Sequence, residues 1–216
     1  MPPAGAPSKA GAVFDGYYAG LHRAGARYYT EEMESAKDWD IPADTELIAY
    51  WVSIGGPGPA GGHVFYDKGE YTDGWRYLEA APVSTEWIDK PWGGSGTEVG
   101  TAAQGTDVGT GAANTQAIVA AYGSTDPDEA RSDYAAKLAD DLVFGGYDDW
   151  YLPSRDELDL IYQELFAEDT GDFTAIHYWS SSEVNNNSAW VKNFDSDLQG
   201  GLSKDLEYRV RAIRAF

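Results

Sequence analysis

The side chains that could carry catalysis in this 216-residue chain are few and dispersed. The sequence has no Cys, which excludes disulfides, thiolate metal sites and thiol nucleophiles. The three histidines, His22, His63 and His177, lack the helical or hairpin spacing of metal ligands. We therefore expect no zinc or non-haem iron site and interpret these histidines as structural or exposed.

Serines and carboxylates offer the remaining routes to catalysis. The serine run at 180–182 is not set in a Gly-x-Ser-x-Gly elbow, so we interpret it as a source of scaffold hydrogen bonds. The acid pairs at 148–149 and 156–157 could act as acid and base, but adjacent carboxylates are expected by chance among 36 Asp and Glu. The sequence predicts a protein that is not an enzyme and needs no cofactor.

One acidic stretch has part of a calcium-loop pattern. Asp195, Asp197, Gln199 and Gly200 follow positions 1, 3, 5 and 6 of an EF-hand loop. Position 12 is Leu206, where the loop needs a bidentate Glu. A structural calcium ion stays open on this pattern, but no metal ligand is predicted.

Composition narrows the range of partners. Fifteen Lys and Arg against 36 Asp and Glu give a net charge of -21, which repels nucleic acid and anionic lipid. Hydrophobic residues make up 43%, with 8 Trp, 15 Tyr and 7 Phe, so the chain is expected to fold. The N-terminus has no apolar signal-peptide core and no run is long enough to span a bilayer, which predicts neither Sec export nor membrane insertion.

The patterning predicts strands and helices in separate stretches. Strands are expected at 46–54, 63–66 and 75–80, the last two as a hairpin, and short strands dominate from 177 to 216. Helices are expected at 30–39, from an N-cap at Asn114, at 132–143, and after a capping box of Ser154 and Glu157. This segregation indicates an α+β domain with a small antiparallel sheet, two or three helices and extensive loops.

The last forty residues contrast a rigid frame with small, irregular residues. The tract at 184–207 shows neither strand alternation nor helical periodicity, which predicts an exposed loop on a framework, where binding function concentrates. A surface loop without a role is the alternative. The predicted frame consists of Trp179, Trp190, Phe194, Tyr208, Arg209 and Arg211, and the arginines are expected to form internal ion pairs or to hydrogen-bond to the loop backbone. The predicted ligand contacts are Val184, Asn185, Asn187, Val191, Asn193, Asp195, Ser196, Asp197, Leu198, Gly200, Gly201, Leu202, Ser203, Asp205 and Leu206.

Several ordered motifs resemble one known family. They lie at 58–69, 74–82 and 146–154, in the Trp-Ser-Ser-Ser-Glu run at 179–183 and in the closing Arg-Ala-Phe. Together they resemble the C-terminal domain of bacterial collagen-like adhesins over about residues 46–216. The resemblance implies a C-type-lectin-like fold of the branch shared with formylglycine-generating enzymes, whose cysteine chemistry this chain cannot perform.

Part of that family looks like the variable proteins of diversity-generating retroelements, whose receptor-binding C-termini are rewritten at template adenines. Mutagenesis of AAC codons at both adenines gives residues such as Asn, Ser, Asp, Gly, Leu, Val and His, and the twelve predicted contacts other than Asn belong to this set. Lys192, Gln199, Lys204 and Glu207 do not. The resemblance therefore implies a hypervariable surface at 184–207, in which these four positions are either fixed or encoded by other codons.

The resulting hypothesis is a non-catalytic binding protein displayed on a virus particle or cell surface. Residues 1–45 form an N-terminal arm for attachment or oligomerisation, and residues 46–216 form the ligand-binding domain. The partner is a protein or glycan on another cell, and homo-oligomerisation would add avidity. A fixed-sequence adhesin or glycan-binding module is the alternative, with an enzyme of the formylglycine-generating type less favoured.

Overall fold

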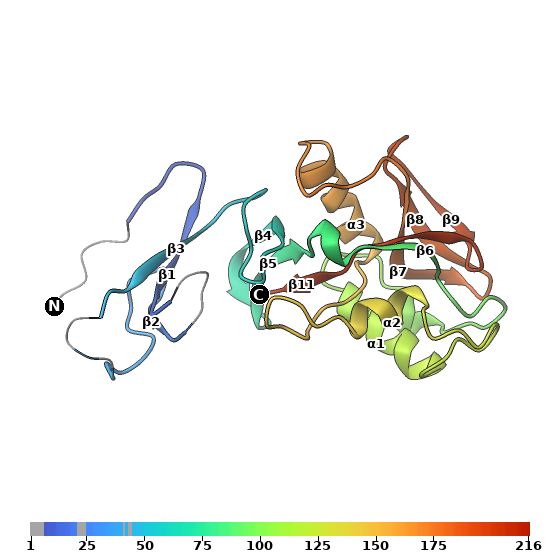
Figure 1. Ribbon diagram of the computed structural model, residues 1–216, viewed down its shortest axis with the longest axis horizontal. Coiled ribbons are helices and arrows are strands. Elements are labelled where there is room, and N and C mark those ends of the chain that lie inside the picture. The colour runs from blue at the N-terminus through green and yellow to red at the C-terminus, as the bar shows by residue number, and fades with distance from the viewer. Residues whose placement is uncertain (1–6, 21–24, 41, 43–44) are drawn as a thin grey trace.

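The structure, a computed structural model, is an α+β protein with three sheets and few helices (Figure 1). It describes residues 7–20, 25–40, 42 and 45–216, so His22 lies outside the described residues. The first sheet, drawn in blue at the left of Figure 1, has the order β2-β1-β3. Its strands are β1 (Val13–Tyr18), β2 (Arg27–Tyr29) and β3 (Ile48–Val52).

This first sheet crosses the predicted boundary at residue 45. Its central strand β1 pairs antiparallel with both β2 and β3, although β3 belongs to the stretch predicted as the binding domain. The predicted helix at 30–39 is wrong, because turns and an isolated bridge between Tyr29 and Ser35 occupy that stretch. One buried cluster joins the sheet to the rest of the protein: Tyr18, Tyr50, Val52, Val64, Tyr77 and Phe216.

The second sheet is built on the predicted hairpin, which is confirmed. β4 (His63–Thr72) and β5 (Trp75–Ala80) pair antiparallel, and β11 (Ile213–Ala215) pairs with β5 on the other side. Asp73 and Gly74 join the hairpin strands with φ of 53° and 84°, the left-handed pair that a two-residue turn requires. The C-terminus of the chain is thereby fixed beside the hairpin.

The third sheet has the strand order β6-β10-β7-β8-β9, so the prediction of one small sheet is corrected to three. The pairing is antiparallel except between β10 and β7, which run parallel. Its strands are β6 (Trp87–Pro91), β10 (Glu207–Val210), β7 (His177–Asn185), β8 (Ser188–Asn193) and β9 (Leu198–Ser203).

Helices cover this third sheet. α1 and α2 contact β7, and α3 contacts β7 and β8. The α-helices are α1 (Gly111–Tyr122), α2 (Ala135–Asp140) and α3 (Arg155–Ile161), and α3 continues as the π-helical turn η4 (Tyr162–Phe166). Two 3-10 turns, η2 (Val83–Thr85) and η3 (Thr101–Ala103), precede them in the chain.

The first residues of α3 and α1 can be compared with the capping residues predicted from the sequence. The capping box is confirmed, since Ser154 Oγ accepts a hydrogen bond from Glu157 N while the Glu157 carboxylate accepts one from Ser154 N. The N-cap at Asn114 is wrong, because α1 begins at Gly111 and Asn114 is buried inside it. The Asn114 amide instead donates to Gly105 O at 2.7 Å and holds the preceding loop.

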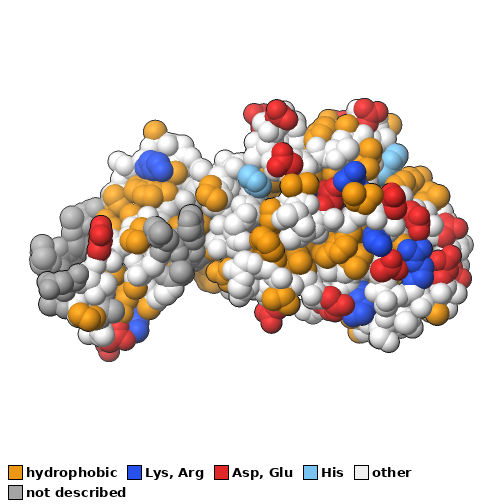
Figure 2. Space-filling view, in the orientation of Figure 1, with side chains coloured by type: hydrophobic (Ala, Val, Ile, Leu, Met, Phe, Trp, Pro, Cys, Tyr) orange, Lys and Arg blue, Asp and Glu red, His pale blue; other side chains and the backbone are white. Residues whose placement is uncertain are grey.

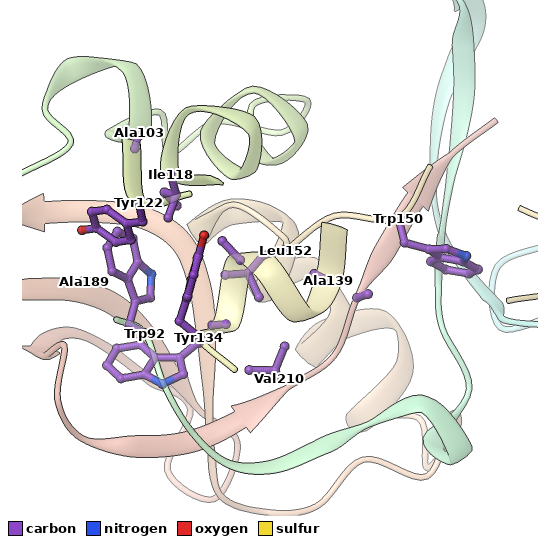
Figure 3. Packing of buried hydrophobic residues seen from close by; sticks show 14 of the residues in the cluster. Trp92, Ala103, Ile118, Tyr122, Tyr134, Ala139, Trp150, Leu152, Ala189 and Val210 are labelled. Atoms are coloured by element: carbon purple, nitrogen blue, oxygen red, sulfur yellow. The ribbon is translucent and has the colours of Figure 1, made fainter. Parts of the chain in front are cut away.

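The core lies on both faces of the third sheet. Consecutive residues on β7 point to opposite faces, so Trp179 joins the cluster that includes α1 and α2, and Tyr178 joins the cluster that includes α3. Figure 3 shows Trp92, Tyr122 and Tyr134 close together in the first cluster, with Trp150 at its other end. Because β7 is buried on both sides, it is a rigid support for the strands beside it.

Candidate functional site

The tract at 184–207 is a meander of strands, which corrects the prediction of an irregular loop. β7, β8 and β9 run antiparallel, and β8 pairs with β9 in an unbroken register from Ser188 opposite Ser203 to Asn193 opposite Leu198. Alternation is missing from the sequence for a physical reason: β8 is half buried on each face, and β9 contains two adjacent glycines. The turns at 186–187 and 194–197 are short, so the tract has little irregular chain.

A groove of about 170 Å³ lies on one face of this meander. Val191 is only 4% exposed and forms part of its lining, whereas Leu198 is 68% exposed. Six of the predicted contacts and two further residues surround it: His177, Val191, Asn193, Ser196, Leu198, Gln199, Gly200 and Leu202. The structure thus brings scattered tract residues together into one concave surface.

Gly200 keeps this groove open. A Cβ added at Gly200 meets no atom within 4 Å, and the residue does not have a positive φ. Neither close packing nor backbone conformation therefore requires glycine here. A larger side chain at this position would occupy the groove itself.

A buried ion pair closes the base of the meander. Glu183 near the end of β7 and Lys204 just after β9 are joined at 2.6 Å, and both side chains are 0% exposed. The Glu183 carboxylate also accepts hydrogen bonds from Val99 N and Gly100 N, and Lys204 Nζ donates to Thr97 O. Burial lowers the pKa of Lys204, while the hydrogen bond to Glu183 opposes that shift. The two ends of the tract are thereby bound to each other and to the loop at 97–100.

A second buried lysine holds the middle of the meander. Lys192 on β8 is 2% exposed and donates to Asp159 on α3 at 2.6 Å and to the Asp197 carboxylate. Its ammonium also lies 4.4 Å from the ring centroid of Tyr162. The turn between β8 and β9 is therefore attached to α3, although its Asp197 side chain is 61% exposed.

The predicted frame residues are mostly buried beneath this surface. Trp179 donates through Nε1 to Lys90 O at 2.9 Å, and Tyr208 packs on it with ring centroids 5.0 Å apart. Arg211 and Arg209 both pair with Glu86, which confirms the internal ion pairs expected for the arginines. Phe194 is 1% exposed in the cluster beside α3.

Trp190 differs from the other frame residues. It is only partly buried, and the guanidinium of Arg155 lies 5.1 Å from its ring centroid. It faces the side of the sheet opposite the groove, where its register partner is Gly201. Trp190 therefore contributes to the surface as well as to the support.

The family model of the Lcl C-terminal domain matches residues 104–214, which is just over half of the chain. The chain belongs to the Lcl C-terminal domain family. This confirms the family resemblance, and the match covers the whole meander, the buried Lys204 and the helices α1, α2 and α3. The motifs at 58–69 and 74–82 lie outside the matched stretch of this Lcl C-terminal domain protein.

The fold has a solved counterpart. The structure is similar to the crystal structure of a fimbrial protein from Bacteroides ovatus ATCC 8483, with a TM-score of 0.50 and 15% sequence identity. The similarity covers 94% of this chain and 48% of that one, so this chain spans about half the length of the fimbrial protein. At this identity the likeness shows the fold alone. Among curated proteins no match is found.

The predicted contacts of this Lcl C-terminal domain protein divide into three groups. Six line the groove, as described above. Gly201 and Ser203 lie on the opposite face of β9. The others lie in or beside turns at the ends of the strands, and are Val184, Asn185, Asn187, Asp195, Asp197, Asp205 and Leu206.

Sequence reasoning missed two lining residues, Gln199 and His177, and the second could have been found. The His177 ring stacks on Tyr208 with centroids 4.7 Å apart and borders the groove. The signal was available: residues 177 and 179 on one strand point to the same face, so His177 follows Trp179 toward the groove side.

Within the part of the chain that the structure describes, no three His, Asp or Glu side chains lie close enough to hold a metal ion. Asp197, part of the calcium-loop pattern, is paired with Lys192 instead. In the same described residues, no helix has the length and apolar character to cross a bilayer. The candidate site is a shallow groove with an apolar lining, and exposed acidic residues lie beside it.

Proposed function

We propose that this protein is a non-catalytic ligand-binding module of the adhesin type, which contacts its ligand through the groove and turns of β7, β8 and β9. The observation that carries the proposal is that six of the predicted contacts line one groove. The sheet beneath this groove contains β7, which is buried on both faces. The family membership and the fimbrial fold fit such a module. A site whose support is already rigid loses little conformational entropy on binding.

We further propose that the meander is diversified by a retroelement and displayed on a virus particle or cell surface, within the C-type-lectin-like branch that the motifs resemble. Supporting this, the two tract lysines outside the accessible codon set are both buried and ion-paired. At these two lysines, residues that the fold requires coincide with residues outside the codon set. The partner would be a protein or glycan on another cell.

The N-terminal residues 1–45 would attach the module to its particle or mediate homo-oligomerisation. Because β1 pairs with β3, deletion of 1–45 removes the pairing partner of a strand that stays. If attachment is the role, the shortened chain still unfolds cooperatively and keeps its ligand binding. Loss of the cooperative transition would count against the proposal.

The diversification is tested by deep sequencing of the 3′ end of the gene in its source population. Substitutions restricted to adenine-derived codons at the predicted contacts, with Lys192 and Lys204 unchanged, are expected. An invariant tract would leave a fixed adhesin.

The binding site is tested with Gly200→Val, which places a side chain in the groove at a residue where a Cβ meets no atom within 4 Å and φ is not positive. Native protein and variant are applied to arrays of glycans and of extracellular proteins. The variant is expected to lose the native binding while its thermal unfolding stays unchanged. Gly201→Ala, on the opposite face of the same strand, is the matched control, and equal binding by all three proteins would refute the site.

A further inference from the structure

We infer that the free edge of β9 binds an extended peptide as an added strand, and that this peptide carries Lys or Arg near both ends of its paired segment. The inference rests on the proposed function, because it names the ligand class for the same surface. It concerns the edge of the sheet, beside the groove, and main-chain groups that do not change with the side chains.

The hydrogen-bond phase shows which groups of β9 point outward. Lys204, the residue after the last paired position Ser203, donates its N–H to Asn187 O at 3.0 Å, so the N–H of Lys204 points toward β8 and the main-chain groups of Ser203 point away from it. Antiparallel strands alternate bonded and non-bonded pairs, so the residues at 198, 200 and 202 bond to β8. The main-chain groups that point away from β8 belong to Gln199, Gly201 and Ser203.

These outward groups have little to bind. β9 is the terminal strand of its sheet. Across the described residues, no other backbone group bonds to the N–H or C=O of Gln199 or Gly201, whereas Ser203 O accepts from Leu206 N at 3.1 Å. The edge therefore presents alternating donors and acceptors at the spacing of a β-strand.

The edge also lacks the features that usually prevent pairing. Proteins protect edge strands with Pro, inward charges, bulges or a covering element. β9 contains no Pro and no charged residue, and its register with β8 has no bulge. Its two glycines fit the rule that a strand glycine marks the close approach of another backbone.

The groove beside this edge would select the side chains of the added strand. Alternate residues of a strand laid along β9 point to the groove face, next to the exposed Leu198 and the partly buried Leu202. Main-chain bonds would supply affinity and these apolar contacts specificity, as in other cases of strand addition.

Charge identifies the ends of the peptide. Asp195 comes just before β9 and Asp205 just after it, both are exposed, and neither forms an ion pair with a described residue. The nearby cations Lys192 and Lys204 are buried in pairs of their own. Figure 2 shows acidic side chains spread over the right-hand end of the molecule, where β8 and β9 lie in Figure 1.

A basic peptide fits this edge better than the other occupants. A six-residue strand spans about 20 Å, so basic residues six to eight positions apart would reach both acids. A glycan has no ladder of alternating N–H and C=O groups. A second copy of this chain would bring its own two aspartates to the same ends.

The test begins with random nonapeptides displayed on phage and selected on the immobilised full chain. Selected peptides are synthesised and titrated calorimetrically against native protein, Gly201→Ala and Gly201→Pro. Proline removes the outward N–H of residue 201, while alanine adds a Cβ and keeps that N–H. Both variants meet the same Val184 contact and differ in the edge donor and in the fixed φ of proline, so the thermal unfolding of each is measured beside its affinity.

Selected peptides are expected to carry Lys or Arg at both ends and apolar residues at alternate positions between them. Gly201→Ala should bind within about twofold of native, and Gly201→Pro about tenfold more weakly, at equal thermal stability. Raising NaCl from 50 to 300 mM should weaken binding to the native chain.

Three results would overturn the inference: no peptide enriched over selection on an unrelated acidic protein, enriched peptides without basic ends, or equal affinity of the alanine and proline variants. If these occur while Gly200→Val still abolishes array binding, the proposed function stands and only the peptide class falls. If Gly200→Val leaves array binding unchanged, the proposed function itself falls.

Discussion

Two regions of the meander differ in burial: its base, where Glu183 and Lys204 join the two ends of the tract, and its edge, the strand β9. At the base, Glu183 and Lys204 are fully buried and bonded to each other and to a neighbouring loop. At the edge, Leu198 is mostly exposed and Gly200 has open space where a side chain would be. The tract is held in shape by a few buried charges, so substitutions at its outer residues are expected to disturb the fold little.

The largest effect is expected from breaking the base. Lys204→Met leaves the Glu183 carboxylate buried without its cation, which should reduce the free energy of unfolding by about 3–5 kcal/mol. Urea titration followed by tryptophan fluorescence measures the loss. The double variant with Glu183→Gln should recover part of it, and a loss below 1 kcal/mol in the single variant would mean that the pair does not hold the base.

The support behind the meander has its own buried acid, whose effect is expected to depend on pH. Burial raises the pKa of Glu157 to about 7, against hydrogen bonds from Ser154 N and Gly109 N that lower it. A raised folded-state pKa gives stability that is present below the unfolded pKa, about 4.5, and lost as pH rises to 7.

Measured as the difference between native protein and Glu157→Gln, this contribution should change by about 3 kcal/mol between pH 4.5 and 7 and stay constant above pH 8. Thermal or urea unfolding at each pH gives the two curves. Parallel curves throughout that range would show that Glu157 has the same pKa in the folded and the unfolded chain.

An intermediate effect is expected at the middle of the meander. Lys192→Met removes the cation shared by Asp159 and Asp197, and those carboxylates are partly exposed and can be solvated. The loss of unfolding free energy should be about 1–2 kcal/mol, smaller than at Lys204. A loss as large as that of Lys204→Met would contradict the ranking by burial.

The smallest effect is expected at the edge. Leu198→Ser changes a side chain that is 68% exposed, so unfolding free energy should change by no more than about 0.5 kcal/mol. The same substitution should weaken ligand binding, because it removes an apolar wall of the groove. A stability loss above 1 kcal/mol would show that Leu198 supports the fold, and the contrast between base and edge would then fail.

The sequence predicted local structure well where the signal was local. The hairpin with its Asp-Gly turn and the capping box of Ser154 and Glu157 each depend on residues within a few positions, and both formed as expected. The prediction of a helix at 30–39 was wrong because its acids and single Trp provide no apolar face for packing. The residues just before it pair with β1 as a strand. The prediction of an N-cap at Asn114 was wrong because its side chain bonds to Gly105, outside the helix, instead of to the first turn of the helix.

The sequence by itself determined that this chain folds without disulfides, repels polyanions, and separates an aromatic frame from a tract of small residues. Composition and motif order are enough for these properties, because each is a sum over residues or a local pattern. Only the tertiary structure decided that the tract is a meander, that Val191 lines a groove and that Lys192 and Lys204 are buried. Those properties depend on Asp159, Glu183 and the register of β8 with β9, and such long-range pairings leave no periodic trace in the tract.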